Sequence, residues 1–161
     1  MSSPLDNSHN YDYNMCMLSV NKKKIIMFSL GILSLCLGTF IYILFREDTY
    51  IAKTVISLID LSGIKHILYG LDNAFIKYYF PDFLWAFSLC CIVLVILTPK
   101  RKISTIFSSS IIFFWGSLYE ILQMMNIIGG TGDIVDIMLY LLATLTADII
   151  YLRSCGHEKN F

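Results

Sequence analysis

Four long apolar stretches constrain this chain more than any other feature of its sequence. They cover residues 25–45, 80–98, 103–125 and 134–152. Each has the ~20 residues that a helix rising about 1.5 Å per residue needs to cross a hydrocarbon layer of about 30 Å. Lipid offers the backbone no hydrogen-bond partner, so such stretches fold as helices. The sequence therefore predicts an all-α, polytopic integral membrane protein with four transmembrane helices.

The composition supports the same class and excludes others. Of the 161 residues, 57% are hydrophobic and 15% are charged, whereas an average soluble domain has about 45–50% and about 25%. The net charge is zero, so no basic surface is available for nucleic acid. The five cysteines lack the spacing of metal ligands and fit small buried hydrophobic residues better than a disulfide framework. We expect no metal site and no cofactor.

The segments outside the four spans are polar or mixed. Residues 1–21 are predicted to be a disordered cytoplasmic tail, and residues 153–161 a short polar cytoplasmic tail. Between the first two spans, residues 46–80 mix charges with apolar residues at helical spacing. This pattern predicts one or two amphipathic helices that lie on the membrane surface or cap the bundle. The membrane domain itself is expected to cover residues 22–152.

Basic residues predict the orientation in the membrane. Eight lysines and arginines flank the spans on the side of the two termini, and four lie on the opposite side. Cytoplasmic loops carry the excess of positive charge. We therefore expect a multi-pass protein of the bacterial inner (cytoplasmic) membrane with both termini in the cytoplasm, so that the turn after the third span faces outward.

Two features at the ends and faces of the spans predict local contacts. Gly31 and Gly38 lie seven residues apart on the first span with Ser34 between them, which indicates close helix packing or simply the frequent use of glycine in membrane helices. At the start of the second span, Asp82 suits the positive end of the helix dipole. The aromatic residues around it form an interfacial belt of Tyr78, Tyr79, Phe80 and Trp85.

The third span carries the polar residues that most need an explanation. Glu120 and Gln123 are three residues apart and share a helical face. A turn rich in glycine follows, and then Asp133 and Asp136 open the fourth span. An ionisable group within a bilayer costs at least ~2.5–3.5 kcal/mol, so it needs a partner, a cavity or a function. We predict a binding pocket formed by Glu120, Gln123, Asp133, Asp136, Tyr119 and Trp115.

Structural roles are the alternative for each acidic residue. Asp133 suits the cap of the fourth helix, with Asp136 in its first turn. Glu120 has the alternative of structural hydrogen bonding within the bundle. Asp148, near the cytoplasmic end, is expected to form an interfacial ion pair with Arg153. The sequence has no motif of a known nucleophile, metal ligand set or phosphate loop, so we predict no catalytic residue.

The same residues resemble a known family. The stretches 119–123 (YEILQ) and 130–136 (GTGDIVD) are similar to the VanZ-like family, in which a Glu and a Gln on one membrane helix are followed by Asp-x-x-Asp at the start of the next. The likeness covers residues 81–147. Tyr140 stands where many members have Asn, and Ala143 and Ala147 replace expected glycines, which indicates a short, divergent member. The founding member is associated with low-level teicoplanin resistance, which implies a role in the cell envelope.

Three functions are consistent with these observations. The leading hypothesis is an envelope protein of non-enzymatic or undefined biochemical activity, linked to glycopeptide tolerance, whose outward pocket binds a polar headgroup, a peptide or a cation. The second is a small proton- or cation-linked solute transporter that works as a homo-oligomer, with Glu120 or Asp148 taking up protons. The third is an enzyme that acts on lipid-linked cell-wall precursors, with the carboxylates as acid and base. Expected partners are membrane lipids and a lipid-linked envelope precursor or a glycopeptide.

Overall fold

The computed structural model describes residues 4–45, 54 and 75–154, with side chains from residue 21 onward. This part of the chain is helical, without strands. Its helices are α1 (Pro4–Phe45), α4 (Phe80–Leu97), α5 (Lys102–Met124) and α6 (Ile134–Ser154), and a short π-helical segment, η2 (Phe75–Tyr79), leads into α4. Four of these segments are long and apolar enough to cross a membrane. The prediction of an all-α, polytopic membrane protein is confirmed.

The ends of the predicted segments differ from the observed helices. A disordered tail was expected over residues 1–21, whereas α1 in the structure already begins at Pro4. Proline suits the first position of a helix, and no glycine or proline follows it before Gly31. Extending an existing helix is also far easier than nucleating one. At the other end of the chain, α6 continues to Ser154, two residues into the predicted tail.

The segment between the first two spans is described only at its end. The amphipathic helices predicted for 46–80 fall mainly on residues 46–53 and 55–74, outside the described residues. The described end forms η2 and is continuous with α4. The second membrane-spanning segment therefore runs over Phe75–Leu97 and begins before the predicted start at residue 80.

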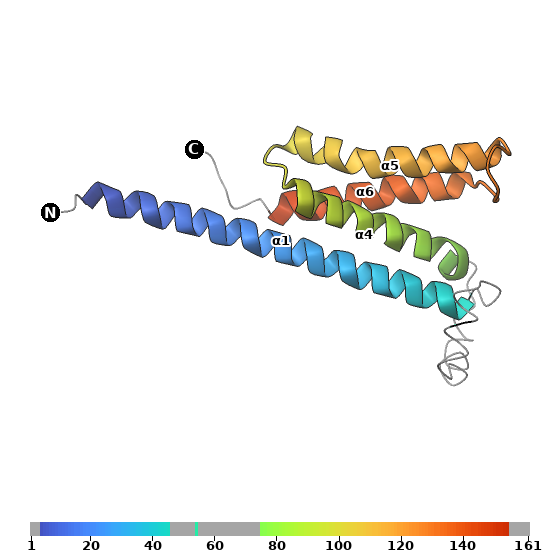
Figure 1. The fold of residues 1–161 in the computed structure, drawn as a ribbon, viewed down its shortest axis with the longest axis horizontal. Helices are drawn as coiled ribbons and strands as arrows, with labels where there is room; N and C mark the ends of the chain where they lie inside the picture. Colours follow the sequence, from blue (N-terminus) through green and yellow to red (C-terminus); the bar gives the residue numbers. More distant parts are fainter. Residues whose placement is uncertain (1–3, 46–53, 55–74, 155–161) are drawn as a thin grey trace.

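The helices pack side by side around α4 (Figure 1). Helix α1 lies along one side of α4, while α5 and α6 pack against each other and against α4. The start of α1 and the end of α6 lie at one end of the bundle (Figure 1). The end of α1, η2 and the turn between α5 and α6 meet at the opposite end. The polar residues predicted to form a pocket belong to this second end.

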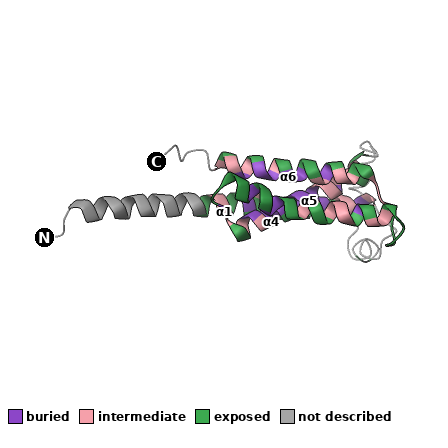
Figure 2. Ribbon diagram, turned by 90° about the horizontal axis from the view of Figure 1, so that it is seen from above, coloured by how far each residue is buried: buried purple, intermediate pink, exposed green. Residues whose placement is uncertain are grey.

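Apolar packing among α1, α4 and α6 forms the core. Figure 2 shows buried residues mainly on the faces that the helices turn toward one another and exposed residues on the outer faces. The core cluster comprises Met27, Ala86, Phe87, Cys90, Cys91, Leu94, Ala143, Ala147 and Tyr151. Outside it, large apolar side chains such as Ile103 and Phe107 are 83% and 74% exposed. A soluble protein buries such side chains, whereas a membrane protein presents them to lipid.

Small residues bring α1 close to α4. A Cβ atom added at Gly31 would lie 3.2 Å from the Cβ of Cys91, and one added at Gly38 would lie 3.0 Å from the indole of Trp85. Between the two glycines, the Ser34 hydroxyl donates a 2.9 Å hydrogen bond to the backbone carbonyl of Leu84. The interpretation of this stripe as a close packing surface is confirmed, because an added methyl group at either glycine would make an unusually tight contact with α4.

Candidate binding site at the loop end of the bundle

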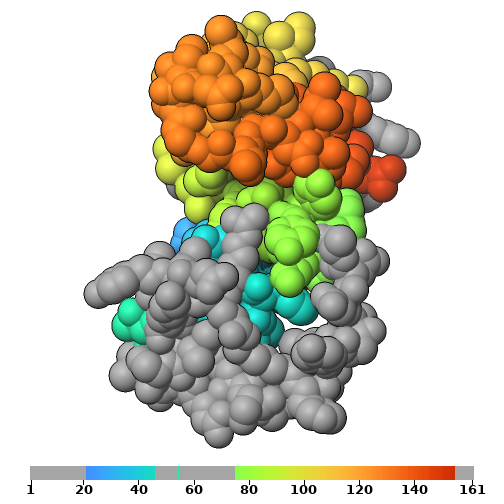
Figure 3. All heavy atoms as spheres, turned by 90° about the vertical axis from the view of Figure 1, so that its right-hand side faces the viewer, coloured from blue at the N-terminus to red at the C-terminus, as the bar shows by residue number. Residues whose placement is uncertain are grey.

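A hollow of about 680 Å³ opens at the end of the bundle where η2 meets the α5–α6 turn. Figure 3 looks at this end, with the orange turn and the start of α6 above the green η2 segment. The helices α1, α4, α5 and α6, the η2 segment and the turn all contribute to its wall. The lining residues are Tyr42, Tyr78, Tyr79, Asp82, Trp85, Tyr119, Glu120, Gln123, Gly130, Thr131, Asp133, Asp136 and Tyr140.

Glu120 lies at the centre of the hydrogen bonding in this wall. It is 5% exposed and belongs to the second-to-last turn of α5. Its Oε2 accepts a 3.2 Å hydrogen bond from the backbone N–H of Asp133, and its Oε1 accepts a 3.0 Å hydrogen bond from the hydroxyl of Tyr140. The side chain therefore ties α5 to the turn and to α6. Glu120 thus has a structural role in the bundle and also lines the hollow.

Asp133 joins the start of α6 to the start of the second span. Its Oδ1 accepts a 2.9 Å hydrogen bond from the backbone N–H of Val135, which is the geometry of a helix cap. Its Oδ2 accepts a 2.9 Å hydrogen bond from the hydroxyl of Tyr79 on η2. The prediction that Asp133 caps the last helix is confirmed, and the same carboxylate also holds η2 against the turn.

Glycines allow the backbone and rings to approach closely here. A Cβ atom at Gly132 would lie 2.6 Å from the backbone nitrogen of Met124, so the turn rests directly on the end of α5. A Cβ atom at Gly116 would lie 2.7 Å from the ring of Tyr140. Gly116 thus lets this ring lie against α5, and the Tyr140 hydroxyl reaches Glu120 one turn further along that helix. Gly132 and Gly116 therefore allow the backbone N–H of Asp133 and the hydroxyl of Tyr140 to reach Glu120.

The remaining predicted site residues occupy different positions. Gln123 lines the hollow, and its Nε2 donates a 3.5 Å hydrogen bond to the carbonyl of Gly129 in the turn. Asp136 lines the hollow from the first turn of α6, and Tyr119 lines it while 54% exposed. Trp115 is 64% exposed and does not line this hollow. The structure therefore brings five of the six predicted residues together and leaves Trp115 outside.

Several lining residues were not among the predicted site residues. Asp82, Tyr79 and Trp85 come from η2 and α4, Tyr42 from the end of α1 and Tyr140 from α6. Their sequence signals pointed to other roles. Asp82 fitted the helix dipole, Tyr79 and Trp85 fitted an aromatic belt, and Tyr140 was a departure from the family pattern. Only the packing of the helices shows that these side chains share one wall.

The charged residues described in the wall of the hollow are all acidic. Its four carboxylates come from Asp82, Glu120, Asp133 and Asp136, while none of the described lining residues is Lys or Arg. The other large side chains are tyrosines and Trp85. Among the described residues, no three His, Cys, Asp or Glu side chains are grouped as a metal site requires. Among the described residues that line the hollow, the charged groups are all carboxylates, which favour a positive charge over a phosphate or sulfate group.

Comparisons of the chain with models of protein families, with curated proteins and with solved structures found no match. The function is therefore inferred from the geometry of the hollow and from the motif residues that carry the VanZ-like resemblance.

A second buried carboxylate lies nearer the other end of α6. Asp148 is 6% exposed, and its Oδ2 accepts a 2.9 Å hydrogen bond from the hydroxyl of Ser109 on α5. Its Oδ1 is buried without a hydrogen-bond partner among the described residues. The predicted ion pair with Arg153 was wrong, because Arg153 is exposed and follows five residues later, on another face of the helix.

Proposed function

We propose that this chain is a VanZ-like protein of a bacterial cytoplasmic membrane that binds a positively charged ligand at the outer face. Both termini are cytoplasmic in this proposal, since the start of α1 and the end of α6 share one end of the bundle. The eight basic residues on that side against four on the other support this orientation. The resemblance supports a role in the cell envelope, including tolerance of glycopeptide antibiotics.

The acidic and aromatic wall is the observation that carries the proposal. Carboxylates in a partly dry site attract cations far more strongly than they do in water. Aromatic faces add cation–π attraction, which is how proteins recognise quaternary ammonium groups. A lipid-linked precursor carries phosphate, which the four lining carboxylates disfavour. The wall therefore supports a protein that binds an amine or ammonium group more than an enzyme that acts on anionic precursors.

Calorimetry with small ions tests this charge preference. With the full chain in nanodiscs of zwitterionic lipid, we expect tetramethylammonium to bind saturably and at least tenfold more tightly than sulfate. Asp136→Asn removes one lining charge and should weaken tetramethylammonium binding several-fold. Asp148→Asn is the matched control, since it removes a buried aspartate of the same helix that does not line the hollow.

Three results would contradict the proposed function. Binding of sulfate as tight as that of tetramethylammonium would contradict the proposed function. So would an Asp136→Asn variant that binds tetramethylammonium like the unchanged chain. Equal losses in the Asp136→Asn and Asp148→Asn variants would also count against it, because they would indicate damage to the fold instead of a lost contact.

Proton-linked transport is a second candidate, favoured by a polar stripe on α6. Asp136, Tyr140, Thr144 and Asp148 are spaced four residues apart and therefore lie on one face of the helix. Thr144 and Asp148 are buried, as is Ser109 on α5, which bonds Asp148. Ionisable residues buried in membrane helices commonly mark ion or proton pathways.

Flux measurements separate this candidate from simple binding. A transporter should dissipate an imposed pH gradient in proteoliposomes, as read by an entrapped pH-sensitive dye. We expect Asp148→Asn to reduce this flux at least tenfold, whereas Asp148→Asn leaves tetramethylammonium binding intact. Flux that persists in the Asp148→Asn and Glu120→Gln variants would exclude both acids as proton carriers and remove this candidate.

A further inference from the structure

A second group of buried polar residues lies between α5 and α6, away from the acidic hollow. Its members are Thr105 and Ser109 on α5 and Thr144 and Asp148 on α6, each no more than 6% exposed. None of them lines the hollow. Asp148 lies six residues before the end of α6 at Ser154, which corresponds to about 9 Å along the helix. The group is therefore within the membrane-spanning part of the bundle, nearer the end where the termini lie.

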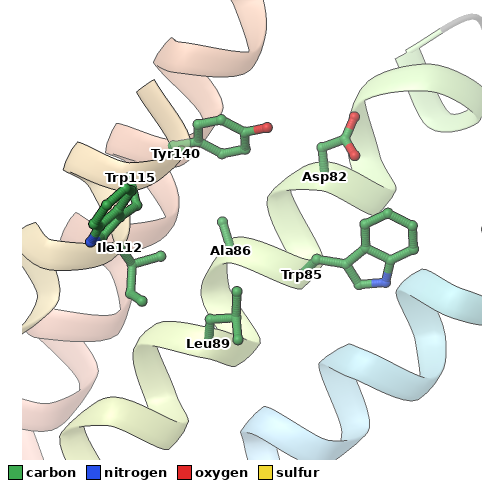
Figure 4. Close-up of a pocket in the computed structure, with 8 residues that line it drawn as sticks. Asp82, Trp85, Ala86, Leu89, Ile112, Trp115 and Tyr140 are labelled. Carbon is green, nitrogen blue, oxygen red and sulfur yellow. The ribbon is translucent and has the colours of Figure 1, made fainter. Parts of the chain in front are cut away.

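Asp148 faces the interior of the bundle. Tyr140 and Thr144 precede it at steps of four residues, so the three share one side of α6. In Figure 4 the Tyr140 hydroxyl points away from α6 toward the Asp82 carboxylate of α4. Cys90 of α4, which is fully buried, lies close enough to Asp148 for the two groups to interact electrostatically. Asp148 is therefore turned toward α4 and α5 and away from lipid.

The described neighbours of Asp148 supply no positive charge. On α5 the neighbouring polar group is the hydroxyl of Ser109, which donates a 2.9 Å hydrogen bond to Oδ2. On α4 the titratable neighbour is the Cys90 thiol. On α6 it is Tyr151, one turn further along, whose hydroxyl donates to the carbonyl of Pro99. No described lysine or arginine forms an ion pair with Asp148.

Oxygen atoms around Ser109 outnumber the hydrogen atoms that can join them. The serine hydroxyl has one hydrogen to donate. Three acceptors lie within its reach, which are the carbonyl of Thr105 at 3.3 Å, the carbonyl of Ile106 at 3.0 Å and Oδ2 of Asp148 at 2.9 Å. The Oδ1 atom of Asp148 is buried without a hydrogen-bond partner among the described residues. An ionised Asp148 would therefore have one donor at most, and two carbonyls would compete for it.

Glu120 shows the opposite balance in the same bundle. It is as deeply buried, at 5% exposed against 6% for Asp148. Each of its two oxygens accepts a hydrogen bond of its own, one from the backbone N–H of Asp133 and one from the hydroxyl of Tyr140. A buried carboxylate that lacks such donors becomes neutral by binding a proton. The surroundings of Asp148 are short of one hydrogen, and a bound proton supplies it.

We propose that Asp148 is a proton-binding site inside the membrane, with a proton held on Oδ2 at neutral pH. The Oδ2–H group donates to Oγ of Ser109, and the Ser109 hydroxyl in turn donates to the carbonyl of Ile106. The distances of 2.9 Å and 3.0 Å are those of hydrogen bonds between oxygens. This proposal deepens the transport candidate and rests on it for the use that the chain makes of the proton. Binding of the proton itself follows from the oxygens around Ser109.

Solid-state NMR reads the protonation state of this side chain directly. The full chain is prepared in lipid bilayers at pH 7 with ¹³C at the side-chain carboxyl carbon of aspartate, whose chemical shift differs between a carboxylic acid and a carboxylate. We expect one signal at the shift of a carboxylic acid. Asp148→Asn should abolish this signal, and Asp136→Asn, which changes the other aspartate of α6, should leave it in place.

Two serine variants test the partner of the proton. Ser109→Ala removes the oxygen to which Oδ2–H donates, so the acid signal of Asp148 should move. Ser108→Ala is the matched control, because Ser108 is equally buried on α5 but its hydroxyl bonds the carbonyl of Ser104. It should leave the signal where it is. Exchange of choline for sodium in the buffer should also leave the signal unchanged, since the site holds a proton and not a metal ion.

Failure of this proposal is distinguishable from failure of the transport candidate. If Asp148→Asn abolishes a carboxylate signal, the proton site is wrong, whatever the flux measurements give. If sodium converts the acid signal into a carboxylate signal, the site binds sodium in place of a proton and the proposal is wrong. An acid signal that Ser109→Ala does not move contradicts the assigned partner. If the acid signal belongs to Asp148 but flux persists in Asp148→Asn, the proton site stands and the transport candidate fails.

Discussion

Replacing Gly132 with alanine is expected to destabilise the bundle by about 1–3 kcal/mol or more, because the added methyl group meets backbone atoms. A Cβ atom there would lie 2.6 Å from the backbone nitrogen of Met124 and against the carbonyl of Glu120. Neither atom belongs to a flexible side chain, so the turn itself must move away from α5. The backbone N–H of Asp133 would then leave its acceptor on Glu120. Thermal unfolding in detergent, followed by circular dichroism, measures the loss.

Gly129 provides a matched control in the same turn. A Cβ atom at Gly129 would meet nothing within 4 Å. Gly129→Ala should therefore change the free energy of unfolding by less than about 0.5 kcal/mol, as for an ordinary surface substitution. Similar losses in Gly129→Ala and Gly132→Ala would show that the turn responds to any added methyl group, and the close contact of Gly132 with α5 would not be the cause.

The membrane-spanning helices were predictable from sequence because each depends only on the length and hydrophobicity of its own segment. A run of apolar residues of sufficient length must form a helix in lipid, whatever lies beside it. The start of α1 was not predictable in the same way. Residues 4–21 are polar and show little periodicity, but they continue a helix that the apolar run already nucleates. A helix that is already nucleated extends through such residues at little cost, which their own composition does not indicate.

The sequence predicted which site residues are neighbours on the same helix, but not which residues of different helices meet in the site. Spacing alone placed Glu120 beside Gln123, and the capping pattern placed Asp133 at the start of the next helix. The tyrosines that bond these carboxylates come from elements distant in sequence. Tyr79 precedes Asp133 by 54 residues, and Tyr140 reaches Glu120 only because Gly116 leaves room for its ring. Helix rotation and approach depend on such contacts, which a single sequence does not display.

Replacing Glu120 with alanine is expected to cost about 2–5 kcal/mol and to abolish binding of tetramethylammonium. The substitution leaves two partly buried donors without their acceptor, the backbone N–H of Asp133 and the hydroxyl of Tyr140. An unsatisfied buried polar group costs about 1–3 kcal/mol. It also removes a lining carboxylate from the hollow. Unfolding in detergent and calorimetry in nanodiscs measure the two effects on the same variant.

Two further variants separate the structural role of Glu120 from its charge. Glu120→Gln keeps an amide oxygen for Tyr140 but turns its NH₂ group toward the N–H of Asp133, so its stability should lie between those of the unchanged chain and Glu120→Ala. A double-mutant cycle of Glu120→Ala with Tyr140→Phe should give a coupling energy of about 0.5–3 kcal/mol, since the two groups share a hydrogen bond. A coupling energy of zero would contradict that bond. In that case the buried carboxylate would depend on Asp133 and the turn alone, and Gly116 would lose its part in positioning the site.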